Sequence, residues 1–251
     1  MNRRCFSVWL LMVTMMLSSG QSVAEEIRVA VASNFAGAIK SLAEVFEADS
    51  GHAVALSFGS TGKHYAQIIN GAPFDAFFAA DIRRPKLLEE QGVAIPGSRF
   101  TYAVGKLVLW SPQTDFVDAS GSVLDKGDFR HLAIANPKLA PYGAAAQEVL
   151  QARGLWESLG KRLVRGQNIS QTLQFVRSGN AELGFVAYSQ VLRPGQPLEG
   201  AYWKVPQALY TPIEQQAVLL KDNKVARAFL IFVQGAEVSN IIHAHGYDAP
   251  R

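Results

Sequence analysis

The chain has 251 residues, a formal net charge of +3 and 18% charged residues. A net charge this small argues against a nucleic-acid partner or an anionic membrane surface, because both attract proteins with a concentrated basic patch. Hydrophobic residues make up 49% of the chain, which is enough to bury one large core or two smaller ones.

The first 24 residues predict a secretory signal peptide. Arg3 and Arg4 precede an apolar stretch over residues 6–17, and small residues lead up to a cleavage point after Ala24. The apolar stretch, about 12 residues long, is short against the ~20 residues of a transmembrane helix. Cys5 is the only cysteine and lies within this segment, so we expect the mature chain to carry no disulfide and no lipid anchor.

The mature chain opens with a strand and a helix joined by a polar turn. Residues 27–32 predict a buried strand, Ser33 and Asn34 form the turn, and apolar residues from Phe35 to Phe46 fall on one helical face. Serine and asparagine are preferred helix N-caps, so we expect these two side chains to cap the helix.

The same unit of strand, turn and helix returns along the chain. Further strands are predicted at 53–58, 75–79, 101–110 (one long strand), 132–135, 163–164, 183–187 and 216–220. Further helices are predicted at 65–69, 86–90, 141–153, around 173–176, and near the C-terminus around 225–232 and 238–242. Strands that alternate with helices indicate an α/β fold with largely parallel sheets.

Several of the predicted turns carry hydrogen-bond donors where a strand feeds a helix. In α/β sheets, ligands bind at the carboxyl ends of strands, where the helices begin. A helix N-terminus has unpaired N–H groups and about half a positive charge, so four that converged would hold a dianion without a cationic side chain. The sequence does not show convergence, and ordinary capping explains each turn taken singly. The donor-bearing turns are Ser33/Asn34, Ser60/Thr61, Tyr142 and Ile169/Ser170.

Other motifs give no support for catalysis, nucleotide binding or metal binding. The stretch 59–64 is similar to a P-loop, but its glycine spacing is wrong and no serine or threonine follows Lys63. The sequence contains no Gly-x-Ser-x-Gly nucleophile elbow. His243 and His245 are two positions apart on a predicted helix and cannot share a face. We therefore expect no catalytic residues, no cofactor and no metal ligands.

Three N-terminal stretches are the most distinctive: 29–35 (VAVASNF), 57–68 (SFGSTGKHYAQI) and 70–81 (NGAPFDAFFAAD). Four shorter ones follow in order, at 135–137 (ANP), 140–143 (APYG), 183–187 (LGFVA) and 246–247 (GY). Together they span essentially the whole mature chain. In residues and order they resemble the periplasmic molybdate-binding proteins of molybdate ABC transporters, which are type II periplasmic solute-binding proteins.

The resemblance implies a two-lobed α/β fold, in which two crossover strands join the lobes and the ligand lies in the cleft between them. The first lobe would comprise residues 25–106 plus 212–251, and the second would comprise 107–211.

The resemblance also implies the oxyanion-binding residues, by position. Ser33 and Thr61 would donate from the first lobe through a hydroxyl or backbone N–H. Tyr142 and Ile169 would donate backbone N–H groups from the second lobe. Asn34 and Ser60 lie directly beside the first pair.

One position departs from the family pattern. Some members place an anion-binding tyrosine where this chain has Ala187. Tyr188 is adjacent, but neighbouring residues on a strand point to opposite faces. We therefore expect that Tyr188 does not replace the missing tyrosine.

The function implied by the resemblance is that of a soluble, monomeric periplasmic protein, not an enzyme. It would bind molybdate or tungstate and deliver it to an inner-membrane ABC permease, with no nucleic-acid partner. A pocket made only of donors favours a fully deprotonated oxyanion over hydrogen phosphate. Two alternatives stay open: a protein of the same fold for sulfate or an organic acid, with Arg165 as the candidate clamp, and an exported α/β enzyme.

Overall fold

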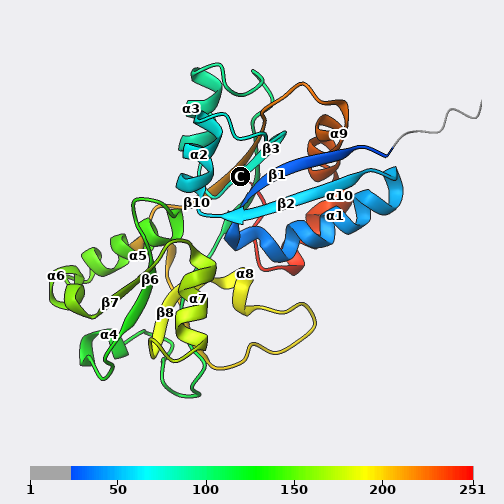
Figure 1. Ribbon diagram of the computed structural model, residues 1–251. Helices are drawn as coiled ribbons and strands as arrows, with labels where there is room; N and C mark the ends of the chain where they lie inside the picture. The colour runs from blue at the N-terminus through cyan, green and yellow to red at the C-terminus, as the bar shows by residue number, and fades with distance from the viewer. Residues whose placement is uncertain (1–23, 251) are drawn as a thin grey trace, which may run out of the picture.

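The computed structural model describes residues 24–250. The predicted signal peptide, apart from Ala24, lies outside the described residues. The described chain forms two α/β units, each built on a five-stranded sheet (Figure 1). This architecture confirms the predicted α/β class.

The first unit contains the strands at both ends of the described chain, in the order β2-β1-β3-β10-β4. Its strands are β1 (Glu26–Ala32), β2 (Ala53–Gly59), β3 (Ala76–Ala79), β4 (Phe100–Gly105) and β10 (Ile213–Leu219). Its helices are η1 (Ser33–Phe35), α1 (Ala36–Ser50), α2 (Thr61–Ile69), α3 (Arg83–Glu90), α9 (Lys224–Val233) and α10 (Ala236–Ala244).

The second unit contains the middle of the chain, and its sheet has the order β7-β6-β8-β5-β9. Its strands are β5 (Leu107–Ser111), β6 (Leu132–Ala135), β7 (Leu163–Gly166), β8 (Leu183–Ala187) and β9 (Ala201–Lys204). Its helices are α4 (Val123–Lys126), α5 (Pro141–Ala152), α6 (Trp156–Leu159), η2 (Gly160–Arg162), α7 (Ile169–Arg177) and α8 (Tyr188–Val191), and η3 (Gln207–Leu209) follows on the way back to the first unit.

Both sheets are mixed, with one reversed strand each. In the first sheet β10 runs antiparallel to β3 and β4, while β1 pairs in parallel with β2 and β3. In the second sheet β5 runs antiparallel to β8 and β9, while β6 pairs in parallel with β7 and β8. The parallel strands end at the same edge of each sheet, so the turns that follow them gather there.

The predicted long strand over 101–110 is wrong in one respect. The structure divides it into β4 and β5, which belong to different sheets and are separated by Lys106. Both parts are largely buried and apolar, so the hydrophobic pattern continues across Lys106 and does not indicate that one strand ends and another begins. The chain passes from the first unit to the second at this point.

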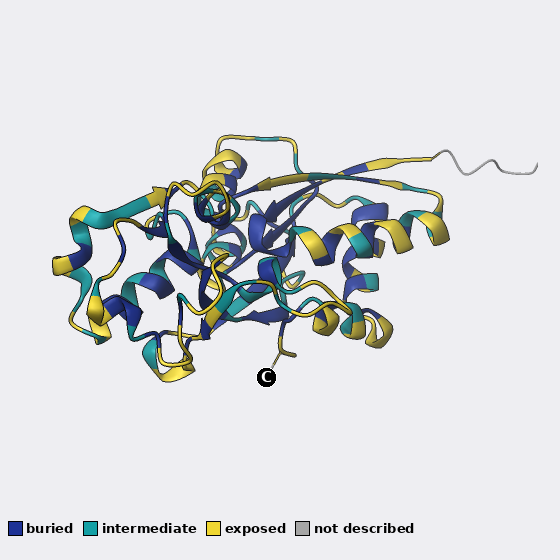
Figure 2. Ribbon diagram, turned by 90° about the horizontal axis from the view of Figure 1, so that it is seen from below, coloured by how far each residue is buried: buried dark blue, intermediate teal, exposed yellow. Residues whose placement is uncertain are grey.

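Each unit has its own apolar core, seen as dark blue strands in the interior of the molecule (Figure 2). The predicted apolar face of the first helix is confirmed, because Ile39, Leu42 and Phe46 of α1 are buried, as is Phe35 at the end of η1. Burial of one such side chain contributes about 1.5–3 kcal/mol. Among residues 24–250 no single helix is long and apolar enough to cross a membrane, and the adjoining α9 and α10 reach that length only as a pair bent by 68°.

Candidate functional site

The four donor-bearing turns meet around one small cavity between the two units. Its volume is about 10 Å³, which is the space of a single water molecule. Residues from β1, β2, α2, α5 and α7 line it, so the predicted turns are close in space although they are distant in sequence. The lining includes all six predicted site residues: Ser33, Asn34, Ser60, Thr61, Tyr142 and Ile169.

Ser33 lies where β1 ends and η1 begins, and it does not cap a helix. The N-cap of η1 is Ala32 and that of α1 is Phe35, so the predicted capping role of Ser33 and Asn34 is wrong. The Ser33 hydroxyl is buried, with the residue 4% exposed, and it has no hydrogen-bond partner in the described part of the chain. An unsatisfied buried hydroxyl costs about 1–3 kcal/mol, so a group held in this position marks a place for a ligand acceptor.

The second turn presents two hydroxyl groups at the start of α2. Ser60 is the N-cap, and its Oγ accepts a hydrogen bond from the Lys63 N–H at 3.3 Å. Thr61 Oγ1 accepts from the Ala80 N–H at 3.0 Å. Since each oxygen already accepts a backbone hydrogen bond, its own hydrogen is free to donate. The backbone fixes both hydroxyls as donors toward the cavity.

The second unit contributes backbone N–H groups from two helix N-termini. Pro141 is the first residue of α5 and Tyr142 the second, while Ile169 opens α7 after the N-cap Asn168. The first N–H groups of a helix have no intrahelical acceptor. Those of Tyr142 and Ile169 have none elsewhere between residues 24 and 250. Their dipoles place partial positive charge at the cavity.

The side-chain amide of Asn34 is already hydrogen-bonded within the protein. Its Nδ2 donates to Gln215 Oε1 at 2.8 Å and to the Tyr247 hydroxyl at 3.1 Å, which uses both amide hydrogens. The Tyr247 hydroxyl donates back to the Asn34 carbonyl oxygen at 2.7 Å. Asn34 can therefore donate to the site only through its backbone N–H.

No side chain of aspartate, glutamate, lysine, arginine or histidine belongs to the described lining of the cavity. Burial raises the pKa of the nearby Tyr142 and Tyr102 hydroxyls, so both phenols stay neutral. An anion here meets uncharged donors and helix dipoles, without a carboxylate to repel it.

Direct hydrogen bonds join the two units around the cavity. The Gly62 N–H donates to the Leu139 carbonyl oxygen at 2.8 Å, and Arg84 Nη2 donates to the Lys138 carbonyl oxygen at 3.1 Å. Arg84 is held by an ion pair with Asp81. These contacts hold the two units together next to the cavity.

Arg165 and Tyr188 lie outside the cavity lining. Arg165 is exposed on β7, where its guanidinium lies 5.9 Å from the Trp156 ring centroid. Tyr188 does not continue β8, as the sequence suggested, but begins α8 and packs against Tyr202 with ring centroids 6.4 Å apart. The side chain at Ala187 is fully buried and adds no donor.

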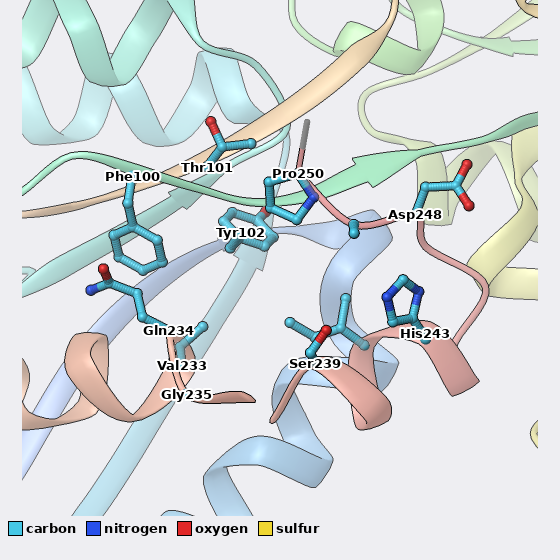
Figure 3. Close-up of a pocket in the computed structure, with 12 residues that line it drawn as sticks. Phe100, Thr101, Tyr102, Val233, Gln234, Gly235, Ser239, His243, Asp248 and Pro250 are labelled. Atoms are coloured by element: carbon cyan, nitrogen blue, oxygen red, sulfur yellow. The ribbon is translucent and has the colours of Figure 1, made fainter. Parts of the chain in front are cut away.

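Other cavities of the described structure are larger than this one. Figure 3 shows one of about 280 Å³ beside β4, α9 and α10. Two of its polar side chains already have partners: His243 Nδ1 lies 2.9 Å from the Tyr247 carbonyl oxygen, and Asp248 forms an ion pair with Lys106. Convergent donors identify a binding site better than volume does.

Comparisons with known proteins agree over nearly the whole chain. The family model described as "Bacterial extracellular solute-binding protein" matches residues 27–248. The chain is 53% identical to the molybdate-binding protein ModA of Azotobacter vinelandii over 227 residues, covering 89% of this chain and 90% of that protein. It is 50% identical to ModA of Rhodobacter capsulatus over 230 residues, covering 90% and 89% respectively.

A solved structure gives the same result. The periplasmic molybdate-binding protein of Azotobacter vinelandii superposes with a TM-score of 0.87 at 44% identity, covering 90% of this chain and all of that one. Sequence and structure therefore agree on the family. The chain belongs to the bacterial extracellular solute-binding proteins, in the branch that includes the molybdate-binding proteins ModA.

Proposed function

We propose that the chain is the periplasmic substrate-binding component of an ABC importer for molybdate, with tungstate as a second ligand. The relatives that share half of its residues are named as molybdate-binding proteins. In this proposal the signal peptide directs export and is cleaved after Ala24, and the mature chain works as a monomer. It delivers its ligand to an inner-membrane permease. It performs no covalent chemistry and uses no cofactor.

The observation that carries the proposal is the ring of neutral donors around one cavity. The hydroxyls of Ser60 and Thr61, at the start of α2, each keep a hydrogen to donate, and the Ser33 hydroxyl lacks any partner among the described residues. Two helix N-termini face them from the second unit. We propose Ser33, Ser60, Thr61, Tyr142 and Ile169 as ligand donors, together with the backbone N–H of Asn34.

This donor set matches the chemistry of a tetrahedral dianion. Molybdate and tungstate carry no proton at neutral pH and present only acceptor oxygens. Hydrogen phosphate carries an O–H that would need an acceptor, which the lining does not offer, so the site disfavours it. Without a cationic side chain, release breaks hydrogen bonds only, which suits a protein that must deliver its ligand.

The proposed lobes comprise residues 25–106 plus 212–251 and residues 107–211. The chain leaves the first sheet after Gly105 and enters the second at Leu107. It returns between Lys204 and Ile213. With only two such connections, the lobes can close around the ligand by a hinge motion.

Calorimetric titration of the mature chain with molybdate, tungstate, sulfate and phosphate tests the function. We expect one molybdate or tungstate per chain, weaker sulfate binding and the weakest binding for phosphate. Thr61→Val keeps the shape of the side chain and removes the hydroxyl, which also leaves the Ala80 N–H without its acceptor, so thermal unfolding is measured beside binding. Loss of a hydrogen bond to a charged group should weaken molybdate binding about 10- to 100-fold. Thr114→Val, at an exposed position, is the matched control. Absence of molybdate binding, or tighter binding of phosphate, would refute the proposal.

A further inference from the structure

Gln215 is a fully buried polar residue at the point where the chain re-enters the first sheet. It lies on β10, which follows the connection from the second unit. The pairing of β10 with β4 is irregular between Gln215 and Gln216, and the two glutamines bind different partners. Gln216 contacts Thr101 and Arg99, whereas Gln215 contacts residues of the oxyanion site.

The amide group of Gln215 contacts both halves of this site. Its Oε1 accepts from Asn34 Nδ2 at 2.8 Å and from the Tyr102 hydroxyl at 3.0 Å. Its Nε2 donates to the Tyr142 hydroxyl at 3.3 Å. Asn34 belongs to the donor turn of the first unit, and Tyr142 lies in the first turn of the donor helix of the second. One side chain thus links the two donor elements directly.

The backbone around Gln215 is shaped to admit this contact. A Cβ atom at Gly105 would collide with the Tyr142 hydroxyl and lie 2.6 Å from Gln215 Nε2. Gly105 pairs with Ile213 at the end of β4, immediately before the chain crosses to the second unit. The Tyr142 ring therefore reaches out of its own unit and rests against the junction between the two.

We propose that Gln215 is a positioning residue that sets the separation between the donors of the two units, and so selects the oxyanion by size. This inference rests on the proposed function. Gln215 does not touch the ligand; it acts through Asn34 and Tyr142. Hydrogen-bond strength falls steeply with distance and angle, so a fixed separation favours the anion whose oxygens match it. A site free to adjust its width would accept a smaller anion more readily.

A set of four variants and one measurement on two anions tests the inference. Gln215→Met keeps the length of the side chain and removes its three hydrogen bonds. Tyr142→Phe removes only the hydroxyl and leaves the backbone donor in place. The third variant combines both changes. The control Gln216→Met removes partly buried hydrogen bonds from the neighbouring residue, away from the site. Molybdate and sulfate affinities are measured by calorimetry, and ligand-free stability by thermal unfolding.

We expect Gln215→Met to weaken molybdate binding about 10-fold and sulfate binding less than about threefold, so that the selectivity ratio falls. Tyr142→Phe should shift the ratio in the same direction. The double variant should be no worse than Gln215→Met alone, because both changes break the same contact. Gln216→Met should lower the unfolding temperature but keep the selectivity ratio of the wild type.

Three outcomes would overturn the inference. The first is a Gln215→Met protein with wild-type affinity and selectivity. The second is an equal loss of affinity for both anions, or a loss of selectivity that Gln216→Met shares. Either result would indicate that Gln215 has a structural role only. If Gln215→Met does not fold, Tyr142→Phe becomes the test. The third outcome is a Tyr142→Phe protein whose selectivity ratio for molybdate over sulfate equals that of the wild type. A wild-type chain that binds no oxyanion would instead refute the proposed function, and the positioning role with it.

Discussion

The hydroxyl of Ser170, on α7, donates a hydrogen bond to the backbone carbonyl oxygen of Ser33 at 3.3 Å. This bond joins the second unit to the turn that carries the unpartnered Ser33 hydroxyl. Gln190 Nε2 donates to the same Ser170 oxygen at 2.9 Å and orients it. The contact exists only while the two units are together, so it couples closure to the position of the donor turn.

Replacement of Ser170 by alanine should speed ligand release. The Ser33 carbonyl oxygen loses the hydrogen bond that the Ser170 hydroxyl donates to it, and a net hydrogen bond of about 1 kcal/mol corresponds to a three- to tenfold faster dissociation. Stopped-flow measurement of molybdate release checks this. Ser178→Ala is the control, because the hydrogen bonds of its hydroxyl stay within the second unit: it donates to the Gln174 and Phe175 carbonyl oxygens and accepts from Asn180 Nδ2. Equal release rates for the two variants would contradict the coupling.

Arg84 should stabilise the closed arrangement of the two units. Its guanidinium is held by Asp81 in the first unit and donates to the Lys138 carbonyl oxygen of the second at 3.1 Å. Arg84→Met keeps much of the side-chain volume and removes this bond, so we expect dissociation to rise about threefold to tenfold while association changes less. Arg83→Met, at the exposed neighbouring position, is the matched control. A variant that changes only the association rate would show that Arg84 steers the anion instead of holding the lobes.

Gly105→Ala should damage both stability and binding. The added methyl group would meet the Tyr142 hydroxyl and Gln215 Nε2, which have no free space to move into because both are buried. Overpacking of this kind costs about 1–3 kcal/mol, and displacement of Tyr142 also shifts a proposed donor. Thermal unfolding and calorimetry measure the two effects. Gly160→Ala meets no atom within 4 Å and should leave binding unchanged. Wild-type affinity in Gly105→Ala would show that the junction is not tightly packed.

His64 should make the stability of the chain depend on pH. It is buried against Phe74 and Phe77, and its Nε2 has no partner in the described structure. Burial, and to a smaller extent the charge of Lys63, lowers the pKa of His64 below its usual 6.5. The unfolded chain therefore takes up a proton more readily, so the His64 contribution is fully present above about pH 6.5 and is lost as the pH falls toward the lowered pKa.

The variant His64→Phe keeps an aromatic ring and removes the titration. Its free energy of unfolding should vary less between about pH 5 and 7 than that of the wild type, because the histidine titrates in this range in the wild type. Chemical denaturation at several pH values measures this difference. His131→Gln changes an exposed histidine and should keep the wild-type pH dependence. An unchanged slope in His64→Phe would place the pH dependence elsewhere in the protein.

Local patterns in the sequence were sufficient for the fold class and for most of the elements, but they did not predict β9 or the short helices α4, α6 and α8. The apolar face of the first helix was predicted residue by residue, because helical spacing alone selects Phe35, Ile39, Leu42 and Phe46. The positions of the donor turns followed from the alternation of strands and helices. Local chemistry could not show that 101–110 is two strands, because both halves are apolar for the same reason.

The arrangement of the site depended on the tertiary structure. Ser33 and Asn34 are residue types that often cap helices. In the structure, the Ser33 hydroxyl has no partner among the described residues, and the Asn34 side chain is hydrogen-bonded to Gln215, 181 positions away. In the sequence, Gln215 is an ordinary polar residue at the edge of a strand. The sequence determined which backbone N–H groups would be left free, because helix ends always leave them. Only the packing of two separate sheets decided that these groups face one point, because that depends on contacts between residues far apart in the chain.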